Sequence, residues 1–185
     1  MRQGDLELAR RAAEGDRAAF HDVVDRYADN LFRLARSLVR SRADAEDVVQ
    51  ETFIEAYRGI GGFDGRASLR TWLSRILMRR AARVWRRRRR QPWMSLEAAV
   101  ESAATGASLA VPPETLAVDQ RLDVRAVLPM LGHQHREILL LREMQGMSYA
   151  QIAQVLGVPQ GTVESRLFRA RAELRERLKE YERLK

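Results

Sequence analysis

Residues 148–171 read SYAQIAQVLGVPQGTVESRLFRAR and predict a helix-turn-helix. Ser148 and Gln151 have the spacing of a capping box, in which both side chains satisfy free backbone groups at the start of a helix. Gly157 suits the left-handed conformation that ends a helix, and Pro159 suits entry into the next one. The apolar residues expected at the contact of the two helices are Ile152, Leu156, Val158 and Val163.

The second of these helices has two contrasting faces. The stripe at helical spacing that should face the core comprises Val163, Leu167, Ala170, Leu174, Leu178 and Tyr181. The residues that lie off this stripe are Gln160, Thr162, Glu164, Ser165, Phe168, Arg169 and Arg171. Because a major groove admits the polar N-terminal end of an exposed helix, this pattern favours DNA binding over a merely solvated helix face.

The composition fits a nucleic-acid partner and excludes several other classes. The chain has 33 Lys and Arg against 25 Asp and Glu, and its formal net charge of +8 raises the encounter rate with a polyanion. There is no cysteine, so neither a disulfide nor a thiolate metal site can form. The three histidines lack metal-like spacing, and we expect no metal or cofactor. Without a membrane-length apolar run or a signal peptide, the expected location is the cytoplasm.

Two helices should dominate the first half of the chain. Residues 17–40 carry an apolar stripe, and residues 43–60, ADAEDVVQETFIEAYRGI, carry another that we expect to consist of Val49, Phe53, Ala56 and Ile60. The second helix also carries a predicted acidic ridge, made of Asp44, Asp47, Glu51 and Glu55. Such a ridge cannot favour DNA; it indicates either a basic protein partner or a solvated helix face.

A glycine-rich loop and a basic helix follow. Residues 59–65, GIGGFDG, predict an adaptable loop, and a helix is expected over residues 71–85 before a run of five arginines. Trp72 can pack in the core or stack on an unpaired base beside the arginines, which can hold the backbone of a nucleic acid.

The remaining segments complete an all-α prediction with two domains. Residues 91–118 are rich in Ala and Ser and contain Pro112-Pro113, which indicates a linker between domains at 1–90 and 119–185. In the second domain, Pro129 and Gly132 predict a helix break before a helix over residues 135–144.

Four segments in series carry a family resemblance. In this order they read ADAEDVVQETFIEAYRGI, FDGRASLRTWLSRI, LREMQGMSYAQIA and GTVESRLFRARAEL, and together they resemble the extracytoplasmic-function class of bacterial sigma factors. The resemblance covers nearly the whole chain. It implies a transcription initiation subunit that performs no chemistry, with domains corresponding to the family's regions 2 and 4.

The resemblance also implies partners and a role for each segment. The implied partners are core RNA polymerase, through the clamp helices of its largest subunit and its flap, promoter DNA, and an anti-sigma factor. The residues matching the polymerase-docking segment are Asp47, Gln50, Glu51 and Phe53. The residues matching the −10 segments are Phe63, Asp64, Gly65, Arg66, Ala67, Ser68, Trp72, Arg75, Arg79, Arg80 and Arg83. The residues assigned to the −35 element are Arg142, Gln160, Gly161, Thr162, Glu164, Ser165, Phe168, Arg169 and Arg171.

The sequence departs from the family at a few of these positions. Relatives often have Asn and Asp in place of Arg79 and Arg83, and Lys or Arg in place of Glu164. A carboxylate in the groove is repelled by phosphate but can accept a hydrogen bond from cytosine N4, so Glu164 should shift base preference. Two alternative functions are an ordinary DNA-binding regulator that does not enter the polymerase, and a sigma-like decoy that only sequesters an anti-sigma factor. The acidic ridge and the segment 63–72 argue against the first, and the basic determinants in both domains argue against the second.

Overall fold

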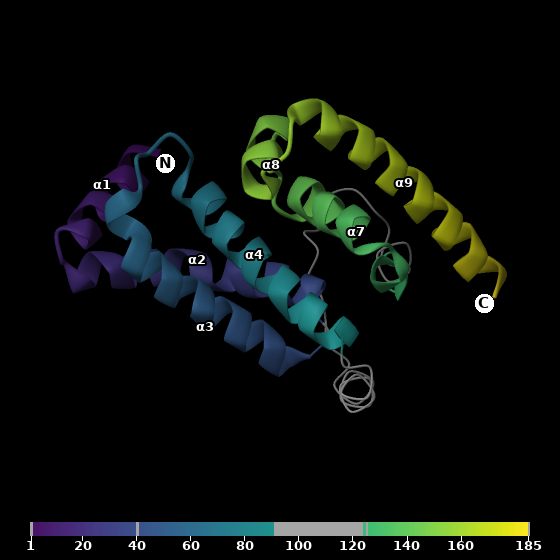
Figure 1. Ribbon diagram of the computed structural model, residues 1–185, viewed down its shortest axis with the longest axis horizontal. Coiled ribbons are helices and arrows are strands. Elements are labelled where there is room, and N and C mark those ends of the chain that lie inside the picture. Colours follow the sequence, from purple (N-terminus) through teal and green to yellow (C-terminus); the bar gives the residue numbers. More distant parts are fainter. Residues whose placement is uncertain (1, 40, 91–123, 125, 185) are drawn as a thin grey trace. The chain divides into compact units, whose positions relative to one another are not determined.

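Helices account for nearly all of the regular structure in the computed structural model, which describes residues 2–39, 41–90, 124 and 126–184 (Figure 1). Within those ranges there is no strand, so the all-α prediction is confirmed. The chain divides into two compact units, whose boundary falls in the segment 91–123 that the structure does not describe. The predicted linker at 91–118 therefore lies outside the described residues.

The first unit contains four long helices and a short connection. They are α1 (Arg2–Ala13), α2 (Arg17–Leu38), α3 (Arg42–Gly59), the 3-10 turn η1 (Ile60–Gly62) and α4 (Leu69–Arg90). Two of the helices begin at side-chain caps, because Asp16 accepts a hydrogen bond from the Ala19 amide at 3.1 Å and Ser41 accepts one from the Asp44 amide at 3.0 Å. The helix α4 continues through the arginine run to Arg90, since arginine is a good helix former.

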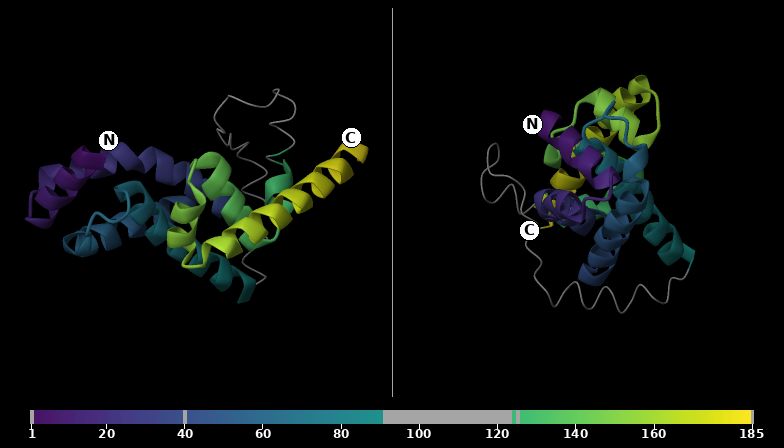
Figure 2. Two further views of the ribbon diagram at one scale, coloured as in Figure 1. Left: turned by 90° about the horizontal axis from the view of Figure 1, so that it is seen from above. Right: turned by 90° about the vertical axis from the view of Figure 1, so that its left-hand side faces the viewer.

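The core of the first unit lies between α2, α3 and α4, with α1 packed on α2 (Figure 2). Its largest fully buried side chains come from α2 and α4, namely Leu31, Leu34, Leu69, Leu73 and Leu77. Of the predicted buried stripe of α3, Ala56 and Ile60 are buried, but Val49 and Phe53 are only half-buried and each lies one position from the true stripe. The stripe instead comprises Ala45, Val48, Thr52, Ala56 and Ile60. The Thr52 hydroxyl donates to the Val48 carbonyl at 2.6 Å, which lets a polar side chain occupy the core.

The second unit is built around the predicted helix-turn-helix. Its elements are η2 (Leu128–Met130), α7 (His133–Leu139), the π-helical turn η3 (Leu140–Met144), α8 (Tyr149–Leu156) and α9 (Gln160–Arg183). Both α7 and α8 pack on α9 (Figure 1). The fully buried side chains of this core include Ile138, Leu141, Met147, Ile152 and Leu167.

The details of the helix-turn-helix agree with the sequence. The Gln151 amide donates to the Ser148 hydroxyl at 3.2 Å, and the Gln151 side chain accepts from the Ser148 amide at 2.8 Å, so the capping box forms. Gly157 ends α8 with φ of +66°, in the left-handed region that suits glycine. Of the predicted contact residues, Ile152 and Val163 are buried, but Leu156 and Val158 are only half-buried, and the buried Val155 was missed.

Candidate functional site

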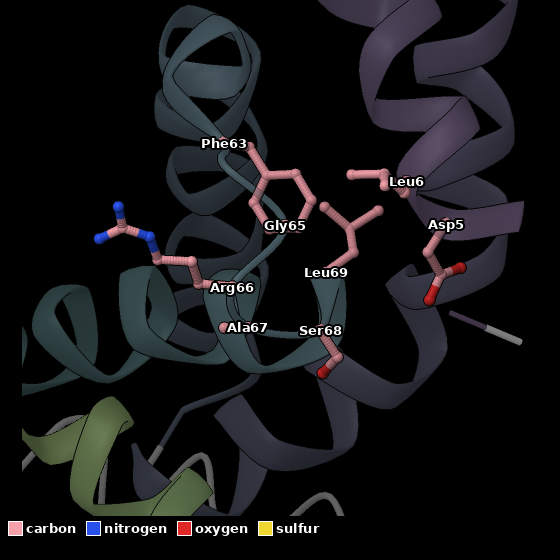
Figure 3. A pocket seen from close by; sticks show the side chains of 8 residues that line it. All are labelled: Asp5, Leu6, Phe63, Gly65, Arg66, Ala67, Ser68 and Leu69. Atoms are coloured by element: carbon pink, nitrogen blue, oxygen red, sulfur yellow. The ribbon is translucent and has the colours of Figure 1, made fainter. Parts of the chain in front are cut away.

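The loop between η1 and α4 borders a cavity of about 270 Å³ (Figure 3). Six of the residues that line it belong to the loop and the start of α4: Phe63, Gly65, Arg66, Ala67, Ser68 and Leu69. Two more come from α1, Asp5 and Leu6, and sequence reasoning did not connect them with any site. The structure thus brings together most of the residues predicted from the loop, with Asp64 next to them in the chain.

Local hydrogen bonds explain the shape of this loop. Asp64 accepts from the Arg66 amide at 3.0 Å, which closes a tight turn, and Gly65 takes a φ of +70° within it. Ser68 accepts from the Thr71 amide at 3.1 Å and so caps the start of α4. The loop therefore has a defined conformation between two helices.

Trp72 sits in the first turns of α4, next to the loop, and is half-buried. Its ring lies 5.5 Å from the ring of Phe63, measured between centroids, with the planes tilted by 56°. This geometry is typical of a stabilising aromatic pair. Trp72 is accordingly a partly packed residue that supports Phe63 at the cavity, rather than a freely projecting ring.

The predicted acidic ridge on α3 is not continuous. Asp44 is only 8% exposed, in the first turn of the helix, so it does not belong to the surface patch. Asp47, Gln50 and Glu51 are exposed, as required of a docking surface, whereas Phe53 is half-buried. The structure thus brings three of the four predicted docking residues onto the solvent face of α3.

An apolar residue lies on that same solvent face. Ile54 is 39% exposed and stands three residues after Glu51 and seven after Asp47, so the three side chains share one side of the helix. Sequence reasoning missed Ile54 because the buried stripe was placed one position away from its true register. With the stripe at Val48 and Thr52, Ile54 falls on the opposite face.

Carboxylates of α3 bind arginines of α4 that were predicted to contact DNA. Arg80 donates to Glu51 at 2.7 Å and to Glu55 at 2.6 Å, and Arg79 also pairs with Glu55. Arg80 is only 24% exposed in its side chain. Arg75 and Arg83, by contrast, are exposed. Two of the four predicted α4 cations are therefore engaged within the first unit, and Arg75 and Arg83 are the more open pair.

The α9 face opposite its core-facing stripe carries most of the residues predicted to meet DNA in the second unit. Val163, Leu167 and Ala170 are buried, which turns the other side of the helix to solvent. The later members of the predicted stripe, Leu174, Leu178 and Tyr181, are only half-buried. The exposed residues there are Gln160, Gly161, Glu164, Ser165, Phe168, Arg169 and Arg171, while Thr162 is half-buried. Phe168 is 72% exposed, an unusual degree for a large aromatic side chain.

Three arginines near this face have partners within the second unit. Arg142 donates to the Met147 carbonyl at 2.8 Å and lies 5.2 Å above the Tyr149 ring, so it braces the start of α8. Arg171 binds Glu143 at 2.9 Å, and this hydrogen bond raises the pKa of its guanidinium. Arg169 donates to the Ser165 carbonyl one turn earlier at 3.2 Å. All three arginines are thus held near the N-terminal half of α9.

Throughout the described ranges, no three His, Asp or Glu side chains gather closely enough to hold a metal ion. His133 and His135 pair with Glu137 and Glu173 instead. In the part of the chain that the structure covers, no helix has both the length and the apolar character needed to cross a membrane.

Comparisons with known families identify two regions of the chain. Residues 23–91 match the model of Sigma-70 region 2, and residues 121–174 match the model of Sigma-70, region 4. The first match contains α3, the loop and α4. The second contains the helix-turn-helix.

Curated relatives match over most of their length. The chain is 35% identical to the RNA polymerase sigma factor NccH of Alcaligenes xylosoxydans, over 92% of each chain. It is 35% identical to the ECF RNA polymerase sigma factor SigM of Mycobacterium tuberculosis, over 93% of this chain and 83% of the relative. It is 37% identical to the ECF RNA polymerase sigma-E factor of Escherichia coli, over 90% of each.

Two solved structures are also similar. CnrH, in complex with the cytosolic domain of CnrY, gives a TM-score of 0.70 at 32% identity, over 95% of this chain and 97% of that one. The sigma factor RpoE of Bartonella quintana, in complex with the anti-sigma factor NepR, gives a TM-score of 0.66 at 30% identity, over 86% of this chain and 96% of that one.

Proposed function

The chain belongs to the extracytoplasmic-function sigma factors of bacterial RNA polymerase, and from this premise we propose how its two units divide the work of promoter-specific transcription initiation. As a sigma factor it binds core RNA polymerase and directs it to promoter DNA. Our proposal assigns polymerase docking and −10 recognition to residues 1–90, and −35 recognition to residues 119–185.

The exposed face of α3 is the proposed polymerase-docking surface. Asp47, Gln50 and Glu51 supply polar and acidic groups for the basic clamp helices of the largest subunit. Ile54 adds an exposed apolar side chain on the same face, one turn beyond them, and apolar groups beside charged ones are typical of specific protein interfaces. Phe53, which is half-buried, supports this surface from the side.

The loop 63–68 and α4 are the proposed −10 site. The cavity beside Phe63 offers a place for a base extruded from the melted strand, and unstacking a base costs only a few kcal/mol that such contacts can offset. Arg75 and Arg83 are exposed on α4 and can hold the backbone of that strand. Arg79 and Arg80 can join them only by exchanging their carboxylate partners on α3.

The exposed face of α9 is the proposed −35 reader. Its N-terminal half presents Glu164, Phe168 and Arg169 at the end of a helix-turn-helix, which is the part that enters a major groove. Arginine can bind guanine or phosphate, glutamate can accept from cytosine N4, and an aromatic edge can contact the thymine methyl group. Arg142 acts mainly by positioning α8.

The proposal also includes a protein partner, a cellular location and the absence of catalysis. CnrH was solved with the cytosolic domain of CnrY, and RpoE of Bartonella quintana with the anti-sigma factor NepR, and we infer an anti-sigma factor for this chain. We also infer that the protein acts in the cytoplasm, where the polymerase is, and performs no catalysis itself. Polymerisation belongs to the enzyme that it joins.

The observation that carries this proposal is that one chain joins a region 2 match with a loop cavity to a region 4 match with an exposed recognition helix. The direct experiment adds the purified chain to sigma-free core polymerase on a genomic DNA library and maps the transcript starts. Shared −10 and −35 sequences upstream of the new starts are expected. Starts at random positions, or none, would overturn the proposal.

A further inference from the structure

The cavity beside the loop is closed on one side by α1, a helix that no match assigns to any role. Asp5 and Leu6 line it from this helix, and Figure 3 shows the Leu6 side chain facing Leu69 and the ring of Phe63. The region 2 match begins at residue 23, after α1 has ended at Ala13. The function of α1 therefore has to be argued from its own contacts.

Leu6 is not needed to attach α1 to the first unit. Leu8, Ala9 and Ala12 are buried and hold the helix in the core, with exposed fractions of 8%, 2% and 5%. Leu6 is 49% exposed, although leucine is among the residues most often buried. Its side chain therefore faces the cavity and solvent.

The loop passes close to the Leu6 side chain at Gly65. A Cβ atom on Gly65 would lie 2.8 Å from Leu6 Cδ1, so a side chain at this position would make the end of Leu6 turn aside. Gly65 also has a φ of +70°, where other residues are strained. The absence of a side chain at Gly65 therefore lets the loop and α1 form one continuous wall.

Asp5 holds this part of α1 in place. Its carboxylate accepts hydrogen bonds from the Tyr27 hydroxyl and from Arg26 Nη1, both at 2.7 Å, and its side chain is only 13% exposed. Burial, together with the hydrogen bond to Asp5, raises the pKa of Tyr27 above its ordinary value. These bonds tie the first turns of α1 to α2 next to the cavity.

The lining chemistry indicates what the cavity admits. Leu6, Phe63 and Leu69 present apolar faces, and the only cation of the lining, Arg66, points its guanidinium away from α1 into solvent (Figure 3). The Asp5 carboxylate would repel a phosphate. At about 270 Å³ the cavity is slightly below the usual ~300–1,000 Å³ of small-ligand pockets. These features suit one flat, uncharged ring system.

We propose that Leu6 contacts the extruded −10 base directly, so that the pocket is shared between the loop and the N-terminal helix. Asp5 is a positioning residue that keeps Leu6 against the loop. This inference rests on the proposed −10 function of the loop, and it adds a wall to the pocket that lies outside the region 2 match.

The test measures how long the complete holoenzyme stays on promoter DNA that is already unpaired at the −10 element. Each non-template nucleotide of that element is replaced in turn by an abasic site, which removes the base and keeps the backbone. With the unsubstituted protein, one abasic position should shorten the lifetime sharply and so mark the captured base. On intact DNA, Leu6→Ala should shorten the lifetime about tenfold, the size expected when a leucine side chain loses most of its apolar contact with a base. Leu6→Met should retain most of it.

The abasic template separates base contact from a structural role. If Leu6 touches the base, Leu6→Ala and the unsubstituted protein should have equal lifetimes once that base is absent. Leu184→Ala, which removes the same atoms from a side chain that is 87% exposed, is the matched control and should change nothing. The inference would be overturned if the Leu6→Ala holoenzyme still had a shorter lifetime than the unsubstituted one on the abasic template. It would also be overturned if the two lifetimes were equal on intact DNA. If no abasic position affects the unsubstituted protein, base capture by the loop itself is wrong.

Discussion

At the scale of single residues, the proposed −35 reading face of α9 carries one exposed aromatic side chain. Phe168 is 72% exposed, one helical turn after Glu164, and both side chains lie on the face opposite the core. An apolar ring in the major groove gains most from the methyl group of thymine, which no other base of unmodified DNA carries. If α9 reads the −35 element as proposed, Phe168 should respond to thymine in that element.

We predict that Phe168→Ala lowers transcription about three- to tenfold on promoters whose −35 element contains thymine, because the apolar contact with the methyl group is lost and burying one carbon group is worth roughly 0.8 kcal/mol. Replacing thymine by uracil in that element removes only the methyl group. It should reduce transcription by the unsubstituted protein and have little effect on the Phe168→Ala variant. The measurement is in vitro transcription on matched templates.

Met130→Ala is a suitable control for this experiment, since Met130 is also exposed, at 55%, and belongs to the same unit but not to α9. Transcription by the Met130→Ala variant should fall on the uracil template as much as transcription by the unsubstituted protein does. If transcription by the Phe168→Ala variant falls on the uracil template as much as transcription by the unsubstituted protein does, Phe168 does not contact the thymine methyl group.

On α3, Asp47 is the cleanest probe of polymerase docking. It is exposed, whereas a change at Glu51 would also release Arg80. We predict that Asp47→Lys weakens binding to core polymerase about tenfold, because a like charge then faces a basic partner. Asp29→Lys, an equal charge reversal at an exposed site of α2, should leave the affinity within about twofold. Fluorescence anisotropy with labelled protein measures both, and equal affinities would contradict the docking surface.

At the scale of elements, the helix-turn-helix depends on how α8 begins and ends. The capping box formed by Ser148 and Gln151 and the left-handed Gly157 set the length of α8, and its buried Ile152 and Val155 then fix it against α9. The orientation of the reading face of α9 therefore follows from a few local interactions.

We predict that Ser148→Ala destabilises the second unit by about 1 kcal/mol, because an N-cap side chain is lost. Gln151→Glu should have almost no effect, since either side chain completes the capping box. Chemical denaturation followed by circular dichroism measures both variants. A loss at Gln151→Glu as large as that at Ser148→Ala would show that the stability of α8 does not depend on the cap.

A second relation between elements concerns α3 and α4. The pairs from Arg80 to Glu51 and Glu55 join the proposed docking helix to the proposed −10 helix across the first unit. Partly exposed ion pairs of this kind contribute little to stability, on the order of 1 kcal/mol or less. Their main consequence is that they leave Arg75 and Arg83 as the more open cations on α4.

At the scale of the whole molecule, the positions of the charged residues say more about binding to polymerase and DNA than the net charge does. The formal charge of +8 describes the entire chain, but the proposed docking face is acidic and the proposed DNA faces are basic. Binding of melted DNA releases roughly 0.7 counterions per phosphate contact. The slope of log affinity against log salt is therefore proportional to the number of cationic side chains that contact the strand.

We predict that replacing Arg75 and Arg83 together by Ala reduces the slope of log affinity against log salt by about 1.4, as expected for two lost contacts to single-stranded DNA. The measurement is holoenzyme binding to premelted promoter DNA between low and moderate salt. Replacing the exposed Arg17 and Arg33 of α2 removes the same net charge and should leave the slope unchanged. Equal slopes for the two double variants would mean that Arg75 and Arg83 do not contact the strand.

Local and periodic interactions make much of this protein predictable from residues alone. The capping box, the turn at Gly157, the buried side of α9 and the all-α class each depend on neighbours within a few positions, so they can be recognised in the sequence. The family resemblance rests on the same kind of contiguous motif.

Other features of the structure depend on contacts between segments that are far apart in the sequence. The register of α3 depends on a hydrogen bond that makes Thr52 acceptable in the core, and the pairing of Arg80 with Glu51 depends on the packing of α4 against α3. The wall formed by Leu6 depends on the fold of α1 onto a loop nearly sixty residues later in the chain. No spacing in the sequence encodes these contacts, because side chains far apart along the chain meet only after each helix has found its neighbours.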